Sequence, residues 1–103
     1  MQKFRISNAA VADMLDIGRY TNKKWGIEQT EMYLKRLDKA FYTLAEQPGL
    51  GRSCDEISYG YKKYAEGKHV IFYRIADDIV IEIIRILHQM MDVSIHILAP
   101  TNN

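Results

Sequence analysis

The segment Ile27–Glu46, with the sequence IEQTEMYLKRLDKAFYTLAE, decides the fold of this chain. Its apolar side chains recur every three or four residues, which is the period of an α-helix with one buried stripe. That stripe consists of Thr30, Leu34, Leu37, Phe41 and Leu44. Pro48-Gly49 follows directly and ends the helix. Such a helix has to cover an apolar surface, which the rest of the chain must supply.

A second helical pattern lies before it, between Ala9 and Lys24. Ser7-Asn8 supplies side-chain oxygens that can cap its start. We expect its buried side to contain Ala10, Met14, Ile17 and Thr21, and its solvated side to contain Asp13, Asp16, Arg19, Tyr20 and Lys23. Trp25-Gly26 interrupts the pattern, and a turn this short between two amphipathic helices predicts an antiparallel helical hairpin.

Alternation of apolar and polar residues replaces the helical period in the second half of the chain. It predicts three strands, Gly60–Ala65, His69–Ile75 and Ile79–Leu87, in addition to a short first strand at Gln2–Ile6. The short connections, with Asp77-Asp78 as a tight turn, make the three later strands an antiparallel meander. Ile79–Leu87 is almost continuously apolar, so we expect it to be central and covered on both faces.

The predicted order is therefore strand, helix, helix, strand, strand, strand. This is an α+β domain in which the helical hairpin packs on an antiparallel sheet. Leu50–Tyr59 is predicted to be a loop, and the pairing of the first strand stays open. We expect one domain over residues 1–98, a helical turn or tail from Met91 to Leu98, and a frayed tail over residues 99–103.

Length and composition suit one soluble domain. The chain has 103 residues and a net charge of +1, which argues against a dedicated, strongly basic nucleic-acid binder. Its one cysteine, Cys54, cannot form an internal disulfide. The N-terminus lacks the apolar core of a signal peptide, and the longest apolar run is too short to span a bilayer. We therefore expect a cytoplasmic protein without a membrane segment.

Sequence motifs for a phosphate-binding loop, a dinucleotide fold or a zinc site are absent. The three histidines, His69, His88 and His96, are not spaced as metal ligands, so we expect packed histidines. A lone cysteine in a loop, such as Cys54, is usually unreactive. The sequence thus predicts neither a metal nor a cofactor.

Cations and tyrosines alternate through the second half of the chain. Such side chains on one sheet face can hold RNA, although a solvated face with half-buried tyrosines is the commoner case. Arg74 and Arg85 each lie in apolar strand sequence, and a half-buried guanidinium needs a carboxylate. The internal candidates are Glu82, Asp55, Glu56 and Asp92; the alternative is an external acidic partner. Trp25 either closes the elbow between the helices or is an exposed anchor for a partner.

Several stretches, taken in order along the chain, resemble the ParE toxins of bacterial toxin–antitoxin modules, within the wider RelE/ParE superfamily. They are Tyr20-Thr21 with Trp25-Gly26, Leu44-Ala45 with Pro48, residues 51–57 (GRSCDEI), Gly60-Tyr61, residues 67–74 (GKHVIFYR), and residues 84–89 (IRILHQ) followed by Met91-Asp92. The resemblance covers nearly the whole chain and implies the same fold. It also implies a toxin that inhibits DNA gyrase, and a cognate ParD-like antitoxin that wraps it in a hetero-oligomer.

The resemblance and the two strand arginines together predict two sets of contact residues. We expect the antitoxin to bind Arg74, Arg85, Leu34 and Tyr73. We expect gyrase to bind a cationic edge formed by Arg52, Lys62, Lys63 and Lys68, together with His88. We expect no catalytic residue and no direct nucleic-acid substrate.

The main alternative is the other branch of the superfamily, whose toxins cut messenger RNA on the ribosome. Those enzymes resemble this chain at Arg74 and His88 but typically follow the histidine with a tyrosine, where this chain has Gln89. An amide cannot act as a general acid or base near neutral pH. Glu46 is the one reasonable carboxylate that could assist His88. A third possibility is an inert module that only titrates an antitoxin.

Overall fold

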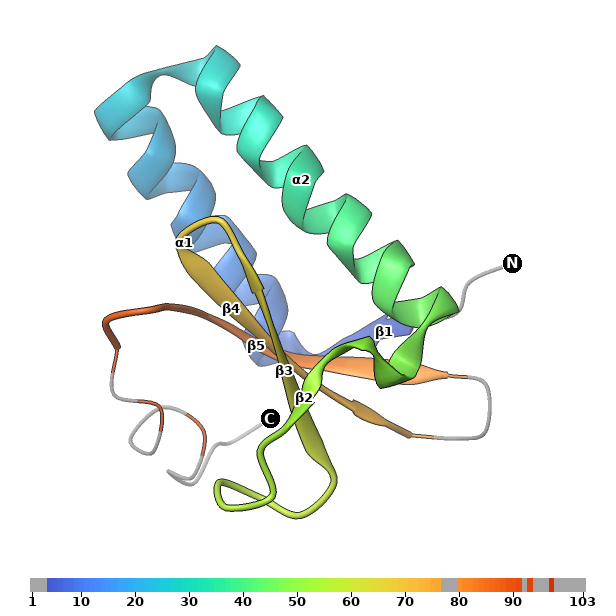
Figure 1. The fold of residues 1–103 in the computed structure, drawn as a ribbon. Coiled ribbons are helices and arrows are strands. Elements are labelled where there is room, and N and C mark those ends of the chain that lie inside the picture. The colour runs from blue at the N-terminus through green and yellow to red at the C-terminus, as the bar shows by residue number, and fades with distance from the viewer. Residues whose placement is uncertain (1–3, 77–79, 92, 94–96, 98–103) are drawn as a thin grey trace.

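The computed structural model describes residues 4–76, 80–91, 93 and 97, and its elements follow the predicted order (Figure 1). They are β1 (Phe4–Ile6), α1 (Asn8–Trp25), α2 (Ile27–Glu46), a 3₁₀ turn (Pro48–Leu50), β2 (Arg52–Ser53), β3 (Tyr61–Glu66), β4 (His69–Ile75) and β5 (Ile81–His88). The α+β prediction is confirmed, and both helices begin and end within a residue of the predicted bounds. The short strand β2 lies inside the segment that was predicted as a loop.

Three sequence predictions concern residues that lie wholly or mostly outside the described part of the chain. The turn at Asp77-Asp78 and the tail over residues 99–103 lie outside the described residues. Most of the segment Met91–Leu98 does so as well. The predicted boundary of the domain at residue 98 therefore stays a prediction.

Short local signals set the ends of the helical hairpin. The Ser7 side chain accepts a hydrogen bond from the Ala10 N–H (3.0 Å) and so caps the start of α1. Gly26 follows α1 with a φ of 90°, a backbone conformation that favours glycine. Its N–H donates to the Asn22 carbonyl, and its own carbonyl accepts the Thr30 N–H. One residue thus ends α1 and starts α2.

The strands form one mixed five-stranded sheet in the order β1-β5-β4-β3-β2. β3, β4 and β5 are the predicted antiparallel meander, and β2 extends it antiparallel at one edge. The sequence left the pairing of the first strand open. In the structure β1 lies parallel to β5, with Phe4 opposite Ile81 and Ile6 opposite Ile83. As expected, β5 is an interior strand that is covered on both faces, since it lies between β1 and β4 and contributes Ile83 to one core and Leu87 to the other. The middle strand of the five is β4.

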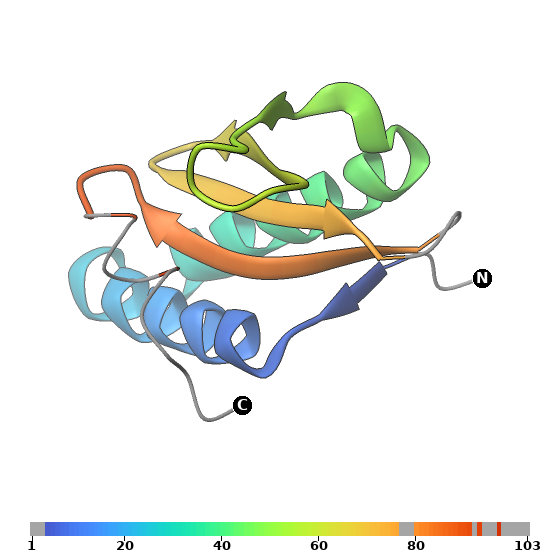
Figure 2. The ribbon, with the colours of Figure 1, turned by 90° about the horizontal axis from the view of Figure 1, so that it is seen from below.

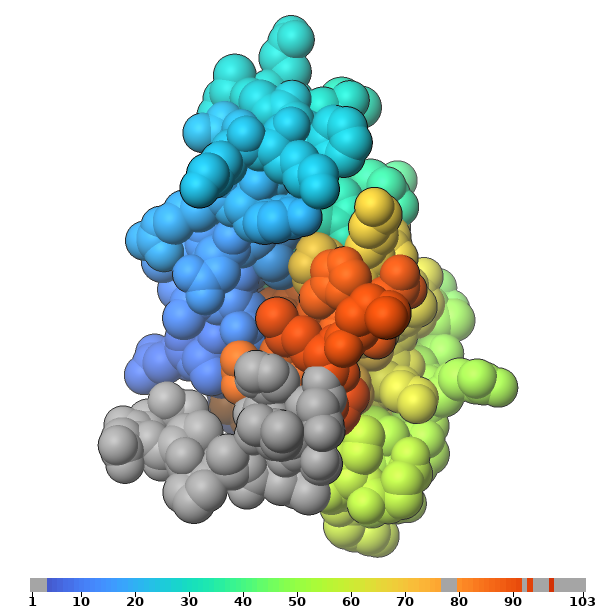
Figure 3. Space-filling model, turned by 90° about the vertical axis from the view of Figure 1, so that its left-hand side faces the viewer, coloured from blue at the N-terminus to red at the C-terminus, as the bar shows by residue number. Residues whose placement is uncertain are grey.

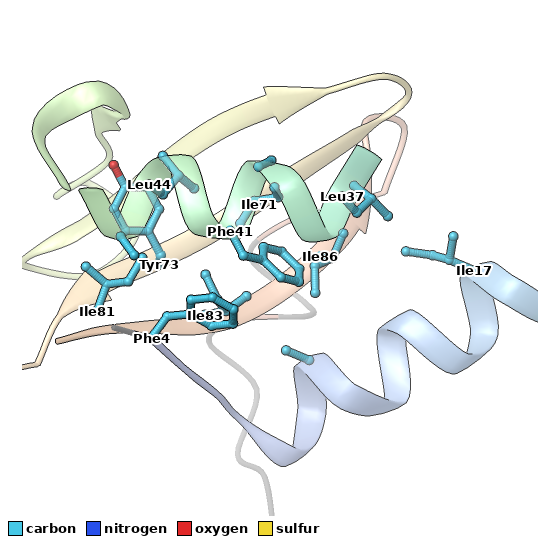
Figure 4. Close-up of a cluster of buried hydrophobic side chains, with 13 residues drawn as sticks. Phe4, Ile17, Leu37, Phe41, Leu44, Ile71, Tyr73, Ile81, Ile83 and Ile86 are labelled. Atoms are coloured by element: carbon cyan, nitrogen blue, oxygen red, sulfur yellow. The ribbon is translucent and has the colours of Figure 1, made fainter. Parts of the chain in front are cut away.

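The main core lies between the helices and one face of the sheet (Figures 1 and 2). The predicted stripe is confirmed: Leu37, Phe41 and Leu44 of α2 are fully buried and point at the sheet (Figure 4). Facing them are Phe4, Ile71, Tyr73, Ile83 and Ile86. Leu34, from the same stripe, is only partly buried against this core.

The opposite face of the sheet carries a smaller core around Cys54, Phe72 and Leu87. Phe72 and Tyr73 are neighbours in β4 that belong to different cores, since side chains alternate along a strand. This explains why β4 is apolar at consecutive positions. Burial raises the pKa of the Cys54 thiol, so Cys54 is a packed apolar group rather than a nucleophile.

The second half of β5 lies beyond the end of β1, and α1 covers this edge. The Ser7 N–H donates to the Ile83 carbonyl (3.0 Å), and the Ser7 hydroxyl donates to the Ile84 carbonyl (2.8 Å). Further along, the Asp13 carboxylate accepts the Ile86 N–H (2.9 Å). An uncovered strand edge exposes unpaired backbone groups to other chains. Ser7 and Asp13 together satisfy three of those groups.

Candidate functional site

Asp13 and Arg85 form a buried ion pair at this edge of the sheet. Nε and Nη2 of Arg85 lie 2.7 and 2.8 Å from the two carboxylate oxygens of Asp13. The Arg85 and Asp13 side chains are only 18% and 11% exposed. Two expectations are corrected here: Asp13 does not lie on the solvated side of its helix, and Arg85 has an internal partner that was not among the candidate carboxylates. The hydrogen bonds from Asp13 raise the pKa of Arg85.

Arg74 pairs with Glu82, which lies directly opposite on β5, at an Nε–Oε1 distance of 2.9 Å. Glu82 was one of the predicted internal partners. The Arg74 side chain is still 46% exposed. Arg74 and Arg85 both line a polar hollow of about 450 Å³, beside Tyr59 and Tyr61. The structure thus brings the two predicted arginines together at one surface.

Tyr73, which was expected to bind the antitoxin, is fully buried. Its hydroxyl accepts the Gly51 N–H (2.8 Å) and donates to the Pro48 carbonyl (2.7 Å), so it ties the 3₁₀ turn to the core. It offers no surface to a partner, and we withdraw it from the antitoxin set. Leu34 lies on the helix side of the sheet, packed against the main core.

The four cations that were predicted to form one edge for gyrase do not lie together, and His88 was expected beside them. Arg52 lies opposite Lys63 across β2 and β3, whereas Lys62 points to the other face because side chains alternate along a strand. Lys68 lies at the β3–β4 turn, four residues from Phe72, the residue opposite Lys63, and so roughly 13 Å from Lys63 along the strand direction. His88 ends β5. Lys68 and His88 instead share a second hollow.

The second hollow lies under the tip of the helical hairpin, where the end of α1, the β3–β4 turn and the end of β5 meet (Figure 3). Its volume is about 510 Å³, within the range of small-ligand sites. We call it the hairpin pocket and define it by Lys24, Trp25, Tyr33, Lys68, His69 and His88. Trp25 is 61% exposed, so it does not close the elbow between the helices as a packed side chain.

A chain of rings forms one side of the hairpin pocket. The Tyr33 hydroxyl lies 2.5 Å from His69 Nδ1 and accepts the Lys68 N–H (3.1 Å). The His69 and His88 rings meet edge to face with centroids 5.4 Å apart, and His88 Nδ1 accepts the Met90 N–H (3.1 Å). Burial, reinforced by His88, lowers the pKa of His69 to about 4. Burial also raises the pKa of the Tyr33 phenol.

This chain of rings was not predicted, although the pairing of the two strands that carry His69 and His88 was. His69 lies eight residues before the predicted turn at Asp77-Asp78 and His88 lies ten residues after it. That turn alone would not place them opposite each other, and the observed register, which includes a shift between Phe72 and Tyr73, does so. Tyr33 comes from another element, which no strand register locates. Gly67 lets it approach: the residue has a φ of 60°, and a Cβ there would lie 2.7 Å from Tyr33 Cε1.

The described residues contain no group of three or more His, Cys, Asp and Glu side chains that could hold a metal ion. His69 and His88 are therefore a pair without a third ligand of these types in the described part of the chain. Of the helices described, none has the length and apolar character needed to cross a bilayer.

Known proteins show the family to which this geometry belongs. The family described as ParE toxin of type II toxin-antitoxin system, parDE, matches residues 4–93. The chain belongs to the ParE toxin family. Toxin ParE1 of Mycobacterium tuberculosis (strain H37Rv) is 42% identical to it over 91 residues, which cover 88% of this chain and 93% of the relative. Toxin ParE1 of Caulobacter vibrioides is 39% identical over 97 residues, which cover 94% and 99%.

A solved structure described as a chromosomal ParDE TA system from P. aeruginosa has the same fold. Its TM-score is 0.71 at 17% sequence identity, over 85% of this chain and 96% of that chain. The resemblance to ParE toxins that the sequence motifs indicated is thus confirmed, and so is the β-α-α-β-β-β order.

Proposed function

We propose that this ParE-family toxin inhibits DNA gyrase by binding to it, without catalysis, and that a ParD-like antitoxin neutralises it in the cytoplasm. Membership of the ParE family supports the gyrase target. The surroundings of His88 support the proposal that the toxin is not an enzyme, because the groups there do not form an acid–base pair suited to neutral pH.

Cutting RNA needs one group to take the proton of the 2′-hydroxyl and another to protonate the leaving oxygen. Such proton transfers each contribute about 10²–10⁴ in rate and work best when the pKa lies near the working pH. Beside His88, the pKa of His69 is lowered to about 4 and that of Tyr33 is raised. Both shifts lead away from neutrality, so His69 is a weak base there and Tyr33 a weak acid.

Glu46, the carboxylate considered for the alternative enzyme, lies at the wrong end of the molecule. Tyr33 of α2 contacts His69, the cross-strand neighbour of His88. Glu46 ends the same helix 13 residues later (46 − 33), which places it roughly 20 Å away at the rise of an α-helix. Together with Gln89 in place of a tyrosine, this separation supports binding over cleavage.

The contact surfaces follow from where the predicted residues lie. For the antitoxin we propose the hollow of Arg74 and Arg85, where the half-exposed Arg74 can meet an acidic side chain in addition to its partner Glu82. Leu34 would be an apolar contact on the helix side. For gyrase we propose two patches, the facing pair Arg52 and Lys63 with Lys62 nearby, and Lys68 with His88 at the hairpin pocket.

The test is a supercoiling assay of purified gyrase with this protein, run beside a translation reaction in which new 5′ ends of a reporter message are mapped. We expect supercoiling to be inhibited and the message to stay intact. Cleavage within codons that is lost in His88→Ala would overturn the proposal in favour of RNA cutting. If neither assay responds, the chain is an inert module that titrates antitoxin.

A further inference from the structure

The hairpin pocket carries positive charge that the described residues do not neutralise. Lys24, Arg36 and Lys68 line it, whereas none of the described Asp and Glu residues does. Arg36 is already paired with Glu66 (2.8 Å). In the described part of the chain, no carboxylate lies within ion-pair distance of Lys24 or Lys68. Two ammonium groups are therefore available to an anion.

Exposed aromatic rings border the same pocket. Tyr20 and Trp25 lie in the last turns of α1, and each is 61% exposed. Lys24 Nζ lies 5.8 Å from the centroid of the Tyr20 ring, so a cation and an aromatic face stand side by side. This combination is the one by which proteins hold a phosphate and stack a base of the same ligand.

The other wall of the pocket is fixed before any ligand arrives. Tyr33 holds His69 and accepts the Lys68 N–H, and the Met90 N–H holds His88. A wall that is already ordered does not have to lose conformational freedom on binding. The pocket has a volume of about 510 Å³, a size that suits a compact ligand.

We propose that the hairpin pocket binds a nucleotide, with its phosphate held by Lys24 and Lys68 and its base stacked on Trp25. The nucleotide is either free or the end of a single strand, since both offer the same phosphate and base. This site shares Lys68 with one of the patches proposed for gyrase, but nucleotide binding does not depend on that contact.

Trp25 is the only tryptophan of the chain, so tryptophan fluorescence reports directly on the pocket. The protein is titrated with AMP, adenosine, inorganic phosphate and a short single-stranded oligoadenylate, with excitation at a wavelength that the bases do not absorb. We expect saturable quenching by AMP. Adenosine and phosphate should each bind at least about tenfold more weakly, because each lacks half of the contacts. An oligoadenylate that binds more tightly than AMP identifies a strand end, and equal affinities identify the free nucleotide.

A matched set of lysine variants tests the assignment. The double variant Lys24→Gln/Lys68→Gln should bind AMP at least about tenfold more weakly, because it loses two charged donors to the phosphate. Lys23→Gln changes an exposed neighbour outside the lining and should bind AMP like the unchanged protein. Circular dichroism of each variant checks that the helices remain folded.

Three results would overturn the nucleotide site: no saturable binding of AMP or the oligoadenylate at millimolar concentration, equal binding of inorganic phosphate alone, or an equal loss in Lys23→Gln. The second would mean an adventitious ion only. If the unchanged protein binds AMP but does not inhibit gyrase, that result counts against the proposed function and not against this site.

Discussion

Asp13 of α1 and Arg85 of β5 are 72 residues apart in the chain and meet in a bidentate ion pair. The same carboxylate accepts the Ile86 N–H, so Asp13 binds both a side-chain charge and a strand edge. The pair therefore holds the first helix on the outer half of β5. Both charged groups are largely removed from water, so each needs the opposite charge of the other to offset the cost of its burial.

Asp13→Asn should lower the free energy of unfolding by about 3 kcal/mol, since it removes a charge that is paired at 2.7–2.8 Å with a largely buried guanidinium. Urea unfolding followed by circular dichroism measures this loss. The matched control is Asp16→Asn, whose partner Arg19 lies 3.1 Å away with both side chains 75% exposed. That change should cost less than about 1 kcal/mol. Equal losses in the two variants would contradict a structural role for the buried pair.

Most of the fold could be predicted because the two hydrophobic periods of this chain are clean. The stripe through Leu37 and Phe41 fixes one helix and its buried face, and Gly26 marks the elbow. Asp13 was wrongly predicted to lie on the solvated side because helical periodicity carries no information about the strand on which the helix packs. Asp13 binds a backbone N–H on the edge of β5. That edge exists because the short β1 pairs with only the first part of β5, and no local sequence pattern predicts this parallel pairing.

The candidate site was less predictable, for physical reasons that differ between residues. The Tyr73 hydroxyl bonds two backbone groups of the 3₁₀ turn, more than 20 residues earlier in the chain. The sequence around Tyr73 therefore does not show that its side chain is fully buried. The pairing of His69 with His88 follows from the strand register. Tyr33 joins them through packing of a helix on the sheet, which strand register does not reach.

Leu37→Ala tests whether the hairpin and the sheet form one cooperative core. Leu37 is fully buried, so the change should cost about 2–5 kcal/mol of unfolding free energy, from lost burial and the cavity left behind. Met32 lies on the same helix but is 62% exposed, so Met32→Ala should stay within about 0.5 kcal/mol. A loss for Leu37→Ala as small as that of the control would mean that the stripe does not face the core.

Tyr73→Phe removes one oxygen and keeps the ring. The Gly51 N–H and the Pro48 carbonyl would then lose their partner near the core, which should cost about 1–3 kcal/mol in chemical unfolding. Tyr59→Phe, at a tyrosine that is 91% exposed, should leave stability unchanged. If the two variants unfold alike, the hydroxyl of Tyr73 has no structural role.

Arg74→Ala tests the proposed antitoxin surface more cleanly than Arg85→Ala, because Arg85 also holds the fold together. The change removes a half-exposed cation and leaves Glu82 to repel an acidic partner. Affinity for the C-terminal half of the antitoxin, measured by calorimetry, should fall by about 2 kcal/mol, or roughly thirtyfold. Arg19→Ala, at an exposed helix position far along α1, serves as the control. An unchanged affinity in Arg74→Ala would remove this hollow from the antitoxin surface.

The low pKa of His69 makes stability depend on pH in a predictable direction. Burial lowers that pKa first, the neighbouring His88 lowers it further and Asp13 opposes the shift, giving about 4 against 6.5 for the ordinary group. The unfolded chain therefore takes up a proton near pH 6.5 that the folded chain refuses until about pH 4, so stability falls as pH drops through this window and the stabilisation is complete above it. Between pH 7 and pH 5, the free energy of unfolding, measured with urea, should fall more in the unchanged protein than in His69→Gln. The glutamine amide of this variant can still pair with the Tyr33 hydroxyl, and the carboxylates titrate alike in both proteins. A proton NMR titration measures the midpoint directly. A His69 midpoint between pH 6 and 7 would show that the imidazole is solvated and that the wall of the hairpin pocket is not closed around it.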